Sequence, residues 1–541
     1  MKQLLSCFLF FSSFVNLHSF AQDNPLFRHL PPDATSVYQV NVPALVSKLN
    51  WQDLIGKFPM NPKDNKSGHM MEMMKNPFAT GINITKDFFV TETVKGNLDS
   101  VTYTTILFHL ADSAKFVAFL SKQEPGLRFF SYPNKGRAAG KDKYGVAWDK
   151  DFAVITIIKP GVGDQLSSPK SAQQAKPQHP MPNYTIQAAK KSFAALKGFD
   201  GSVYTTDPVF KAGFSDDADI HMWAPRGTGI SMLAKNIMKK GHGKDPGFSK
   251  AMNTLYQSKA HTLSALRFEA GKITLKSTTA FPPDSLAFYA KFAGRPLNTD
   301  LVARLPKGDL LAMINLHFDP SAIGEMLDKT KSRAKVDSML AKKELTVDNI
   351  IHSFKGDILL AVVDPANKPV DSSGKKQPSI YLVATIDDLP SFMKLAGKMN
   401  LLQDTTAPDS AGSAPHKSLL SMVKSTYTLK DNILVISGSK ELTDAWFSNS
   451  GKRSTDFIPA RVKDSPFSLF IDLKNVMGFL QGMSRGEPSE KDKKIINALN
   501  KLDAFTLTGG AIRDGKVETY MELKMTDPSE NSLRSLIKTM Q

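Results

Sequence analysis

Hydrophobic and polar side chains alternate one by one along residues 516–525, "KVETYMELKM", near the C-terminus. The apolar positions are Val517, Met521, Leu523 and Met525, and the polar positions between them are Lys516, Glu518, Glu522 and Lys524. A period of two residues predicts a β-strand with one buried and one solvated face. Asp514 and Gly515 directly precede it and are typical of the turn of a β-hairpin.

A similar phrase occurs some 240 residues earlier, in "FEAGKITLKSTTAF". Here the apolar side chains are Ile273, Leu275 and Phe281, and the polar ones are Lys272 and Lys276. Ala270 and Gly271 stand at the turn. Each phrase leads into a segment with helix start signals, "PPDSLAFYAKF" with Asp284 and "DPSENSLRSLIKTM" with Asp527 near the start. The same succession of predicted elements therefore occurs twice in the sequence.

Other segments match in the same order along the chain. Leu30–Leu49 and Leu305–Leu327 both begin Leu-Pro and pass from an apolar strand into a helix. The matched pairs are Asn41 with Asn315 (274 residues apart), Phe116 with Phe392 (276), Val154 with Val435 (281) and Gly271 with Gly515 (244). The separation between matched residues falls to 244 after Val154, which requires extra residues in the first half. A Pro-, Ser-, Gln- and Ala-rich segment at about 161–183 supplies them. These matches predict an internal duplication.

The strand-then-helix phrase recurs within each half, from Ala218 and from Phe467. We therefore predict an α+β fold of two similar halves, each a mostly antiparallel sheet with helices packed on one face. The predicted organisation is a cleavable signal peptide at 1–21, a first α+β repeat at 22–296 and a second at 297–541. A doubly wound parallel sheet fits less well, because the strands often come in hairpin pairs.

The N-terminus has the pattern of an export signal. Lys2 is followed by an apolar run to about Val15, and Ser19-Phe20-Ala21 is a small-x-small cleavage pattern. A competing interpretation is the lipoprotein-like "LLSC", but only six residues precede Cys7. We expect cleavage after Ala21, which removes Cys7 and leaves no cysteine for disulfides, thiolate metal sites or nucleophiles.

The mature chain has no later run of 18 uninterrupted apolar residues, so no transmembrane helix is predicted. We expect an exported protein that is periplasmic, associated with the cell surface or secreted. A peripheral association with the envelope is compatible with this sequence.

Composition indicates a globular protein with more than one domain. The 541 residues are 41% hydrophobic and 22% charged. A formal charge of +17 makes this a basic protein and indicates an acidic partner, such as nucleic acid or an anionic envelope surface. The positive charge is mostly lysine and is spread along the chain, whereas planar phosphate recognition favours arginine. No nucleic-acid-reading motif accompanies it, so nucleic acid is not the expected partner.

No sequence motif identifies catalytic chemistry. The phosphate-binding loop, His-Glu-x-x-His, Gly-x-Ser-x-Gly and a strand-linked Gly-x-Gly-x-x-Gly are all missing from the sequence. The catalytic residues, if the protein has any, are unknown, and we expect no cofactor. "SFMK" (Ser391–Lys394) satisfies Ser-x-x-Lys, but Ser391 falls in the first turn of a predicted helix, where a hydroxyl caps the backbone.

The segment "GHMMEMMKNP" is the most unusual in local composition. His69, Met70, Met73 and Met74 offer imidazole and thioether donors, which suit monovalent copper. On a helix the three methionines share one face, and the simpler interpretation is that this face packs into a core. We expect no resident metal, and these four residues are the candidates should one bind.

Other polar residues are interpreted as structural. His109 and His317 lie in apolar strands and are expected to be satisfied core or edge residues. The acidic groups Asp216, Asp217 and Asp219, and Asp387 and Asp388, lie where the chain turns, and such residues bond their own backbone. The tryptophans Trp51, Trp148, Trp223 and Trp446 are scattered and typical of cores.

Three phrases resemble a known family: "LPPDATSVYQVNVPALVSKL", "NPFATGINITKDFFVTET" and "LPKGDLLAMINLHFDP". They are similar to the exported Bacteroidota family of unknown function DUF4836, in the opening Pro-x-Asp-Ala strand–helix unit and the Thr-Gly-Ile-Asn segment. A fainter similarity is to DUF3352-type envelope proteins. The resemblance covers most of the mature chain, implies an envelope-associated protein and brings no active site with it. Many such proteins look like lipoproteins, whereas this chain lacks a credible lipobox.

We therefore expect an exported, non-enzymatic binding or structural scaffold with a ligand or partner site between its two halves. The expected partner is an envelope component, or a hydrophobic or glycan ligand. One alternative is a hydrolase acting on envelope polymers, whose site residues converge from distant parts of the chain. A second alternative is copper binding at residues 69–74.

Overall fold

The computed structural model describes the chain in fifteen ranges: 24–49, 77–95, 101–123, 127–131, 136–141, 144–159, 184–225, 260–293, 295–306, 308–329, 331–365, 378–399, 426–448, 464–483 and 496–539. The chain forms two compact units: unit 1 is Met1–Thr228 with Thr262–Arg267, and unit 2 is Gly229–His261 with Phe268–Met540. The predicted signal peptide (1–21) and insertion (161–183) lie outside the described residues. The predicted repeats, 22–296 and 297–541, were defined by matching sequence phrases, whereas these units are defined by compactness. The repeats therefore stay a prediction.

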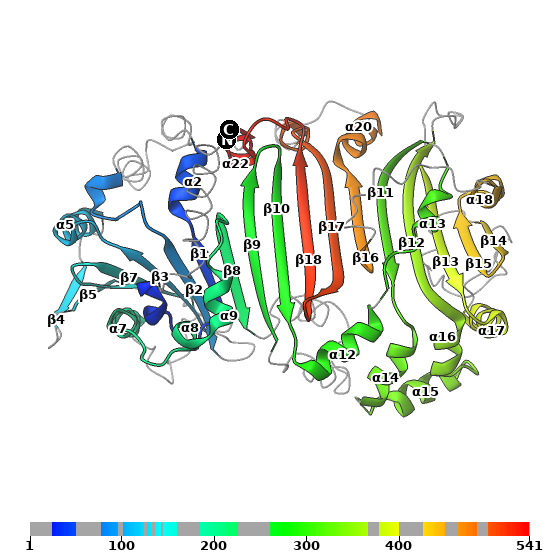
Figure 1. The fold of residues 1–541 in the computed structure, drawn as a ribbon, viewed down its shortest axis with the longest axis horizontal. Coiled ribbons are helices and arrows are strands. Elements are labelled where there is room, and N and C mark those ends of the chain that lie inside the picture. Colours follow the sequence, from blue (N-terminus) through cyan, green and yellow to red (C-terminus); the bar gives the residue numbers. More distant parts are fainter. Residues whose placement is uncertain are drawn as a thin grey trace, which may run out of the picture. The chain divides into compact units, whose positions relative to one another are not determined.

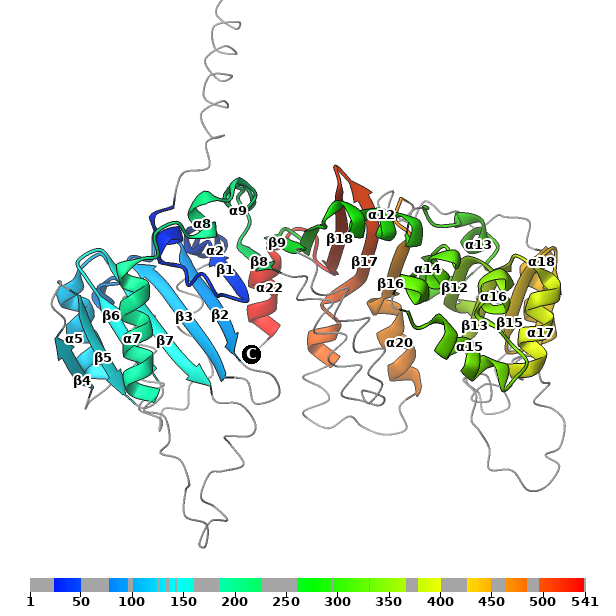
Figure 2. The ribbon, with the colours of Figure 1, turned by 90° about the horizontal axis from the view of Figure 1, so that it is seen from below.

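Unit 1 combines strands with helices on either side of them (Figure 2). Its strands are β1 (Ser36–Val40), β2 (Phe88–Lys95), β3 (Val101–His109), β4 (Arg128–Ser131), β5 (Arg137–Lys141), β6 (Tyr144–Trp148), β7 (Phe152–Lys159) and β8 (Ile220–Pro225). Its helices are η1 (Pro25–His29), α2 (Val42–Lys48), η2 (Pro77–Thr80), α5 (Ser113–Gln123), α7 (Tyr184–Lys197), α8 (Val203–Thr206) and α9 (Pro208–Gly213). Strand β9 (His261–Glu269) contributes residues to both units.

The sheet of unit 1 is antiparallel, in the order β4-β5-β6-β7-β3-β2-β1-β8. Helix α2 follows β1 directly, because the Asn41 side chain accepts a hydrogen bond from the Ala44 backbone and caps the first turn. Strands β6 and β7 are apolar at nearly every position, and their side chains are buried on both faces of the sheet.

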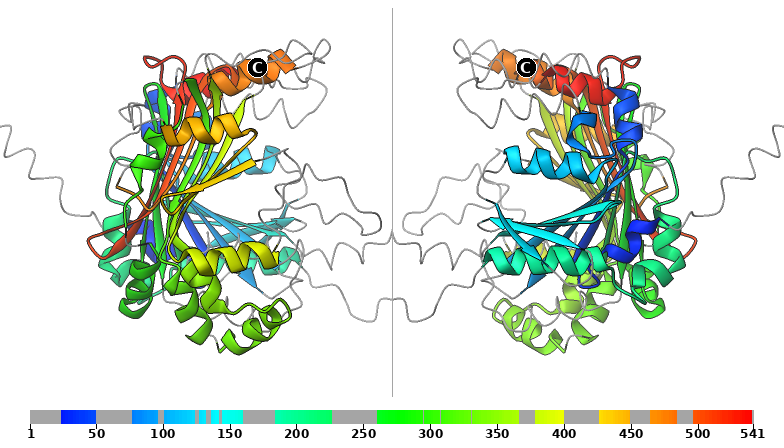
Figure 3. Two further views of the ribbon diagram at one scale, coloured as in Figure 1. Left: turned by 90° about the vertical axis from the view of Figure 1, so that its right-hand side faces the viewer. Right: turned by 90° about the vertical axis from the view of Figure 1, so that its left-hand side faces the viewer.

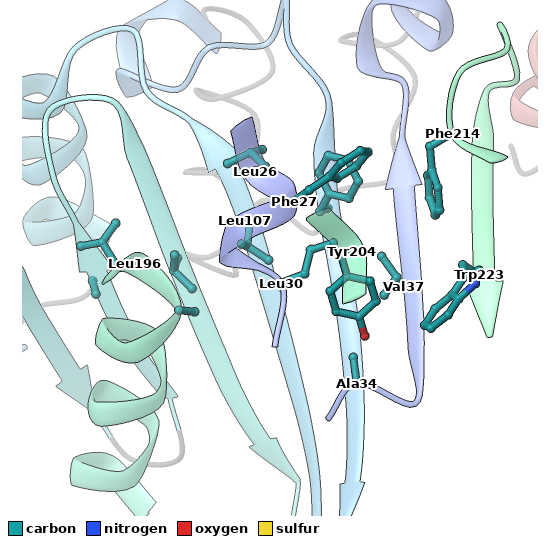
Figure 4. Packing of buried hydrophobic residues seen from close by; sticks show 14 of the residues in the cluster. Leu26, Phe27, Leu30, Ala34, Val37, Leu107, Leu196, Tyr204, Phe214 and Trp223 are labelled. Carbon is teal, nitrogen blue, oxygen red and sulfur yellow. The ribbon is translucent and has the colours of Figure 1, made fainter. Parts of the chain in front are cut away.

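One face of this sheet carries an aromatic-rich core (Figure 4). The Phe27 ring of η1 meets the rings of Phe89 and Phe210 edge-on, with centroids 5.6 and 5.1 Å apart. Helices α7, α8 and α9 lie on this face. On the opposite face, Phe116 of α5 packs against Phe108 and Trp148.

Unit 2 contains the strands β10 (Lys272–Ala280), β11 (Gly308–His317), β12 (Phe354–Pro365), β13 (Ser379–Ile386), β14 (Thr426–Lys430), β15 (Ile433–Ser437), β16 (Phe467–Asp472), β17 (Leu502–Arg513) and β18 (Lys516–Met525). Its helices include α12 (Pro283–Phe292), α13 (Thr299–Ala303), α14 (Ser321–Lys329), α15 (Arg333–Ala341), α16 (Val347–Ser353), α17 (Leu389–Met399), α18 (Lys440–Ser448), α20 (Leu473–Met483) and α22 (Ser532–Thr539). Its sheet is antiparallel as well, in the order β10-β18-β17-β16-β11-β12-β13-β15-β14 (Figure 1).

The predicted α+β class with mostly antiparallel sheets is confirmed. The expectation that helices cover one face is wrong, because helices lie on both faces in each unit (Figure 3). In unit 2, Trp446 of α18 joins the core on one face, while Phe392 of α17 packs on the other. Strand β15, Ile-Leu-Val-Ile-Ser, explains this, because neighbouring side chains of a strand point to opposite faces and all of these are apolar or buried.

The two units share an order of six neighbouring strands. Unit 1 has β6-β7-β3-β2-β1-β8, and unit 2 has β14-β15-β13-β12-β11-β16. The register is shared as well, because Val154 lies opposite Leu107 and its predicted match Val435 lies opposite Val383. Leu107 and Val383 are 276 residues apart, the same separation as Phe116 and Phe392.

One predicted match needs a correction of two residues. The backbone N–H of Asn41 donates to Asp219, which precedes β8, and the N–H of His317 donates to Pro466, which precedes β16. His317 is therefore the positional counterpart of Asn41, and Asn315 is the counterpart of Gln39. The sequence identity of the two asparagines led to the wrong pairing.

The two similar phrases that end the predicted halves are confirmed as hairpin strands. Gly271 and Gly515 sit in the turns before β10 and β18 with φ of +67° and +70°. The two strands also pair with each other in unit 2, with Lys276 opposite Tyr520. These residues are 244 apart, as the glycines are, so the antiparallel pairing of the two strands is centred on matching positions.

Candidate functional site

The residues that the sequence singled out for chemistry do not form a site in the described structure. His69, Met70, Met73 and Met74 lie outside the described residues, so copper binding there stays a prediction. Ser391 lies in the first turn of α17 as predicted, but Asp388 is the residue that caps this helix, since its Oδ2 accepts from the Ser391 backbone at 2.9 Å. Trp148, Trp223 and Trp446 are buried in cores, as expected, and Trp51 lies outside the described residues.

The acidic group before β8 does more than form a turn. Asp216 accepts a hydrogen bond from the Ala218 backbone, as the turn prediction requires. Its carboxylate also lies 2.5 Å from Nε2 of the buried His221 and 2.7 Å from Nη2 of Arg267. The hydrogen bond from His221 is the main cause that lowers the pKa of Asp216. The bond from the Ala218 backbone and the charges of His221 and Arg267 lower this pKa further, and it lies well below its ordinary value.

Asp219, three residues further on, is fully buried and pairs with a lysine. Both of its carboxylate oxygens lie within 2.7 Å of Lys48 Nζ, at the end of α2. A buried carboxylate needs such a partner because removing its charge from water is costly. The ion pair therefore ties α2 to the start of β8.

Unit 2 has a buried histidine–carboxylate pair of its own. His317 Nδ1 lies 2.6 Å from Asp357, whose other oxygen accepts from Thr385 at 3.2 Å and from Asn298 at 3.4 Å. Burial raises the pKa of Asp357, but the hydrogen bond and charge of His317 outweigh it and hold that pKa below its ordinary value. The prediction that His317 is a satisfied core residue is confirmed.

The hydrogen bonds and ion pairs of Asp216, Asp219 and Asp357 stabilise the fold. The carboxylates of Asp216 and Asp357 each accept from several protein donors, and Thr385 both donates to Asp357 and accepts from its backbone N–H. Sequence reasoning missed the partners Arg267, Lys48 and Asn298 because they lie 51, 171 and 59 residues away. Among the described residues, no group of three or more His, Cys, Asp or Glu side chains is placed to hold a metal.

The candidate functional surface is an apolar sheet face in unit 2. Strand register places Leu360 between Ile314 and Leu382, and Ile314 between Leu360 and Leu469, on one face of four neighbouring strands. We call this surface the open apolar face. It consists of Ala312, Ile314, Leu316, Ile358, Leu360, Val362, Ile380, Leu382, Phe467, Leu469 and Ile471.

Several side chains of the open apolar face are exposed at the centre of the sheet. Ile314 and Ile380 keep 40% of their surface exposed and Leu360 keeps 37%, whereas neighbouring positions on the other face, such as Leu359 and Ala361, are fully buried. Aliphatic side chains at the middle of a sheet are ordinarily covered, and a contiguous exposed group marks an interaction surface.

One row of the open apolar face continues across seven of the nine strands of the sheet. From β13 to β10 it contains Leu382, Leu360, Ile314, Leu469, Leu507, Met521 and Leu275. Seven strands spaced by about 4.8 Å make this row roughly 29 Å long. The row therefore has the dimensions of an elongated ligand.

The corresponding positions in unit 1 are more polar. Register places Glu92 where unit 2 has Val362, and Thr104 where it has Ile380. The remaining counterparts of the exposed residues, Tyr38 and Val90, are half-buried. Unit 2 therefore carries the stronger candidate surface.

The described helices include none that is long and apolar enough to span a membrane.

Comparisons with known proteins identify no family. No protein-family model matches the chain. No curated protein matches it either. Among solved structures, crystal form III of TP0453 aligns with a TM-score of 0.27 and 8% identity, covering 52% of this chain and 90% of that one. Crystal form IV gives 0.27 and 8%, covering 50% and 86%. A TM-score at this level does not establish a common fold.

Proposed function

We propose that the protein is a binding scaffold whose open apolar face in unit 2 takes an apolar, chain-like ligand, such as the acyl chain of a lipid. The observation that carries this proposal is the exposure of Ile314, Leu360 and Ile380 side by side on paired strands. Covering an exposed aliphatic side chain stabilises a complex by about 1 kcal/mol. A ligand that lies along the row covers one side chain on each strand that it crosses, and each of these contacts adds to the free energy of binding.

The chemistry of the face favours a lipid over a protein partner. The centres of protein interfaces are enriched in Trp, Tyr and Arg, whereas the open apolar face holds aliphatic side chains and one phenylalanine, Phe467. The chain also carries a formal charge of +17, which attracts anionic headgroups. Export, which the N-terminal sequence predicts, would bring the protein to the envelope, where lipids are abundant.

We further propose that the two units derive from an internal duplication. The shared order of six strands supports it, as does the shared register at Val154 and Val435. Helices α5 (Ser113–Gln123) and α17 (Leu389–Met399) follow β3 and β13, which hold the same place in the shared strand order. A site between the halves, which the sequence led us to expect, stays a prediction.

Binding of the fluorescent fatty acid cis-parinaric acid to the full mature chain tests the proposed function. We expect the fluorescence to rise on binding to the wild type. The triple variant Ile314→Thr, Leu360→Ser, Ile380→Thr should bind at least about tenfold more weakly, because three aliphatic contacts are lost. The control Met339→Ser removes an apolar side chain that is 63% exposed on α15 and is not part of the open apolar face, and it should bind like the wild type.

Circular dichroism and thermal unfolding establish that each variant is folded, which is expected because the substituted side chains are exposed. Wild-type protein that fails to bind the fatty acid would contradict the proposal. Equal binding by the triple variant would contradict the assignment to the open apolar face.

A further inference from the structure

Each unit buries a pair of polar side chains at the same place in its sheet. In unit 1, Gln39 of β1 lies opposite His221 of β8, and in unit 2, Asn315 of β11 lies opposite Ser468 of β16. Their exposed fractions are 6%, 1%, 1% and 0%. The register of the six shared strands makes Gln39 the counterpart of Asn315, and His221 the counterpart of Ser468.

All four side chains leave a buried polar atom without a hydrogen-bond partner in the described part of the chain. These atoms are Gln39 Oε1, His221 Nδ1, Asn315 Oδ1 and Ser468 Oγ. A buried polar atom without a partner costs free energy, and native proteins contain few of them. Their occurrence in two facing pairs, at matching positions of both units, makes these two places candidate sites for a small bridging ligand.

In unit 1 the other polar atom of each side chain already has a partner. Gln39 donates through Nε2 to Asp87, which leaves Oε1 to accept. His221 Nε2 lies 2.5 Å from the Asp216 carboxylate, which leaves Nδ1 for another partner. A water molecule both donates and accepts, so it can bond to both remaining atoms.

In unit 2 the pair combines an amide oxygen with a hydroxyl, which accepts and donates. Side chains directly opposite each other on antiparallel strands have Cβ atoms about 4.5–5.5 Å apart. Asn315 Oδ1 and Ser468 Oγ form no direct bond with each other in the described structure, and one small molecule between them can bond to both. Internal waters in proteins bind in this way to two to four buried polar groups.

We propose that Asn315 and Ser468 hold an internal water molecule, and that Gln39 and His221 hold its counterpart in unit 1. A cation fits less well, because the positively charged Lys48 and Arg267 already neutralise the carboxylates near His221. The two waters would give each sheet a polar bridge, between β1 and β8 in unit 1 and between β11 and β16 in unit 2.

A crystal structure of the full mature chain at about 1.3 Å resolution tests this proposal. We expect a density peak within hydrogen-bond distance of Asn315 Oδ1 and Ser468 Oγ, and a second near Gln39 Oε1 and His221 Nδ1. A reversed Asn315 amide bonded directly to Ser468 would overturn the proposal for unit 2. A direct bond from a protonated His221 to Gln39 would overturn it for unit 1. Empty space at either pair would do so as well.

Unfolding of variants gives a second test that needs no crystal. If a water links the pair, Ser468→Ala and Asn315→Leu should each lower the unfolding midpoint. The double variant should lose less than the two shifts added together, because the first substitution already removes the bridge. A midpoint that rises in Ser468→Ala would overturn the proposal, since it would mean that an unsatisfied hydroxyl had been removed.

Discussion

Gly356 occupies a backbone conformation that other residues rarely adopt. It lies in the bulge of β12 between Phe354 and Ile358, with φ of +108°, and a Cβ there would come within 1.7 Å of the Phe318 carbonyl oxygen. We expect Gly356→Ala to lower the free energy of unfolding by about 2–4 kcal/mol, as strain and a backbone clash combine. Urea unfolding of the full chain measures this.

A glycine in open space is the matched control for this prediction. Gly478 lies on α20, and a Cβ there would meet nothing within 4 Å. Gly478→Ala should leave stability unchanged or raise it by up to about 1 kcal/mol, because alanine favours the helix. Equal losses in both variants would contradict the role assigned to the bulge.

Asp216 should make stability depend on pH. Its folded-state pKa lies below the unfolded value of 3.8, so its contribution is fully present above that value and is lost as the pH falls below it. We expect Asp216→Asn to cost about 1–2 kcal/mol at pH 7, discounted because half of the side chain is exposed. The difference from the wild type should shrink as the pH falls from 4 to 2. Urea unfolding at a series of pH values measures this.

The neighbouring Asp217 provides the control, because its side chain is 96% exposed and lies 3.6 Å from Arg267. Asp217→Asn should change stability little at any pH. A loss in Asp217→Asn as large as that in Asp216→Asn would mean that general charge, and not the bond to His221, explains the effect.

At the scale of single residues, sequence reasoning predicts local bonds and misses distant ones. The turn made by Asp216 and the helix start at Asp388 follow from side chains that bond backbone two or three residues away. The partners of Asp219 and Asp357 come from other elements, and no local pattern indicates them. The same applies to the facing pair Asn315 and Ser468, which only strand register brings together.

At the scale of elements, periodicity predicts strands and hairpins well and layers poorly. The alternation in residues 516–525 predicts β18. Gly515 predicts the turn before β18, and Gly271 predicts the turn before β10. That these two strands pair with each other lies beyond any local pattern. Helix coverage of both faces was missed because runs such as "FAVITIIK" in β7 allow burial on either side.

The open apolar face could not be predicted from sequence for a related reason. Ile314, Leu360 and Ile380 look like core residues in any hydrophobicity pattern, and only the arrangement of helices decides which of them are covered. Helix α17 packs on Leu434 and Ile436 on this side of the sheet, towards β15, and contacts only the border of the face at Leu382. The surface therefore results from the position of a helix and not from unusual residues.

At the scale of the whole molecule, each unit has cores of its own, and this makes the equivalence of the two units testable. Phe116 and Phe392 are both 1% exposed, each on the helix that follows the third shared strand. Either one replaced by alanine should cost about 3–5 kcal/mol, since a fully buried ring is lost. The destabilisation should stay within the unit that contains the substitution.

Hydrogen–deuterium exchange with mass spectrometry can locate the loss. Phe116→Ala should speed exchange in β3, β6 and β7, against which α5 packs, and leave β13 and β15 near their wild-type rates. Phe392→Ala should do the reverse, because its neighbours are Leu434 and Ile436. Faster exchange in both units from either substitution would mean that the cores do not respond separately. Matching patterns at corresponding strands would extend the correspondence from strand order to energetics, which is what two copies of one ancestral unit should retain.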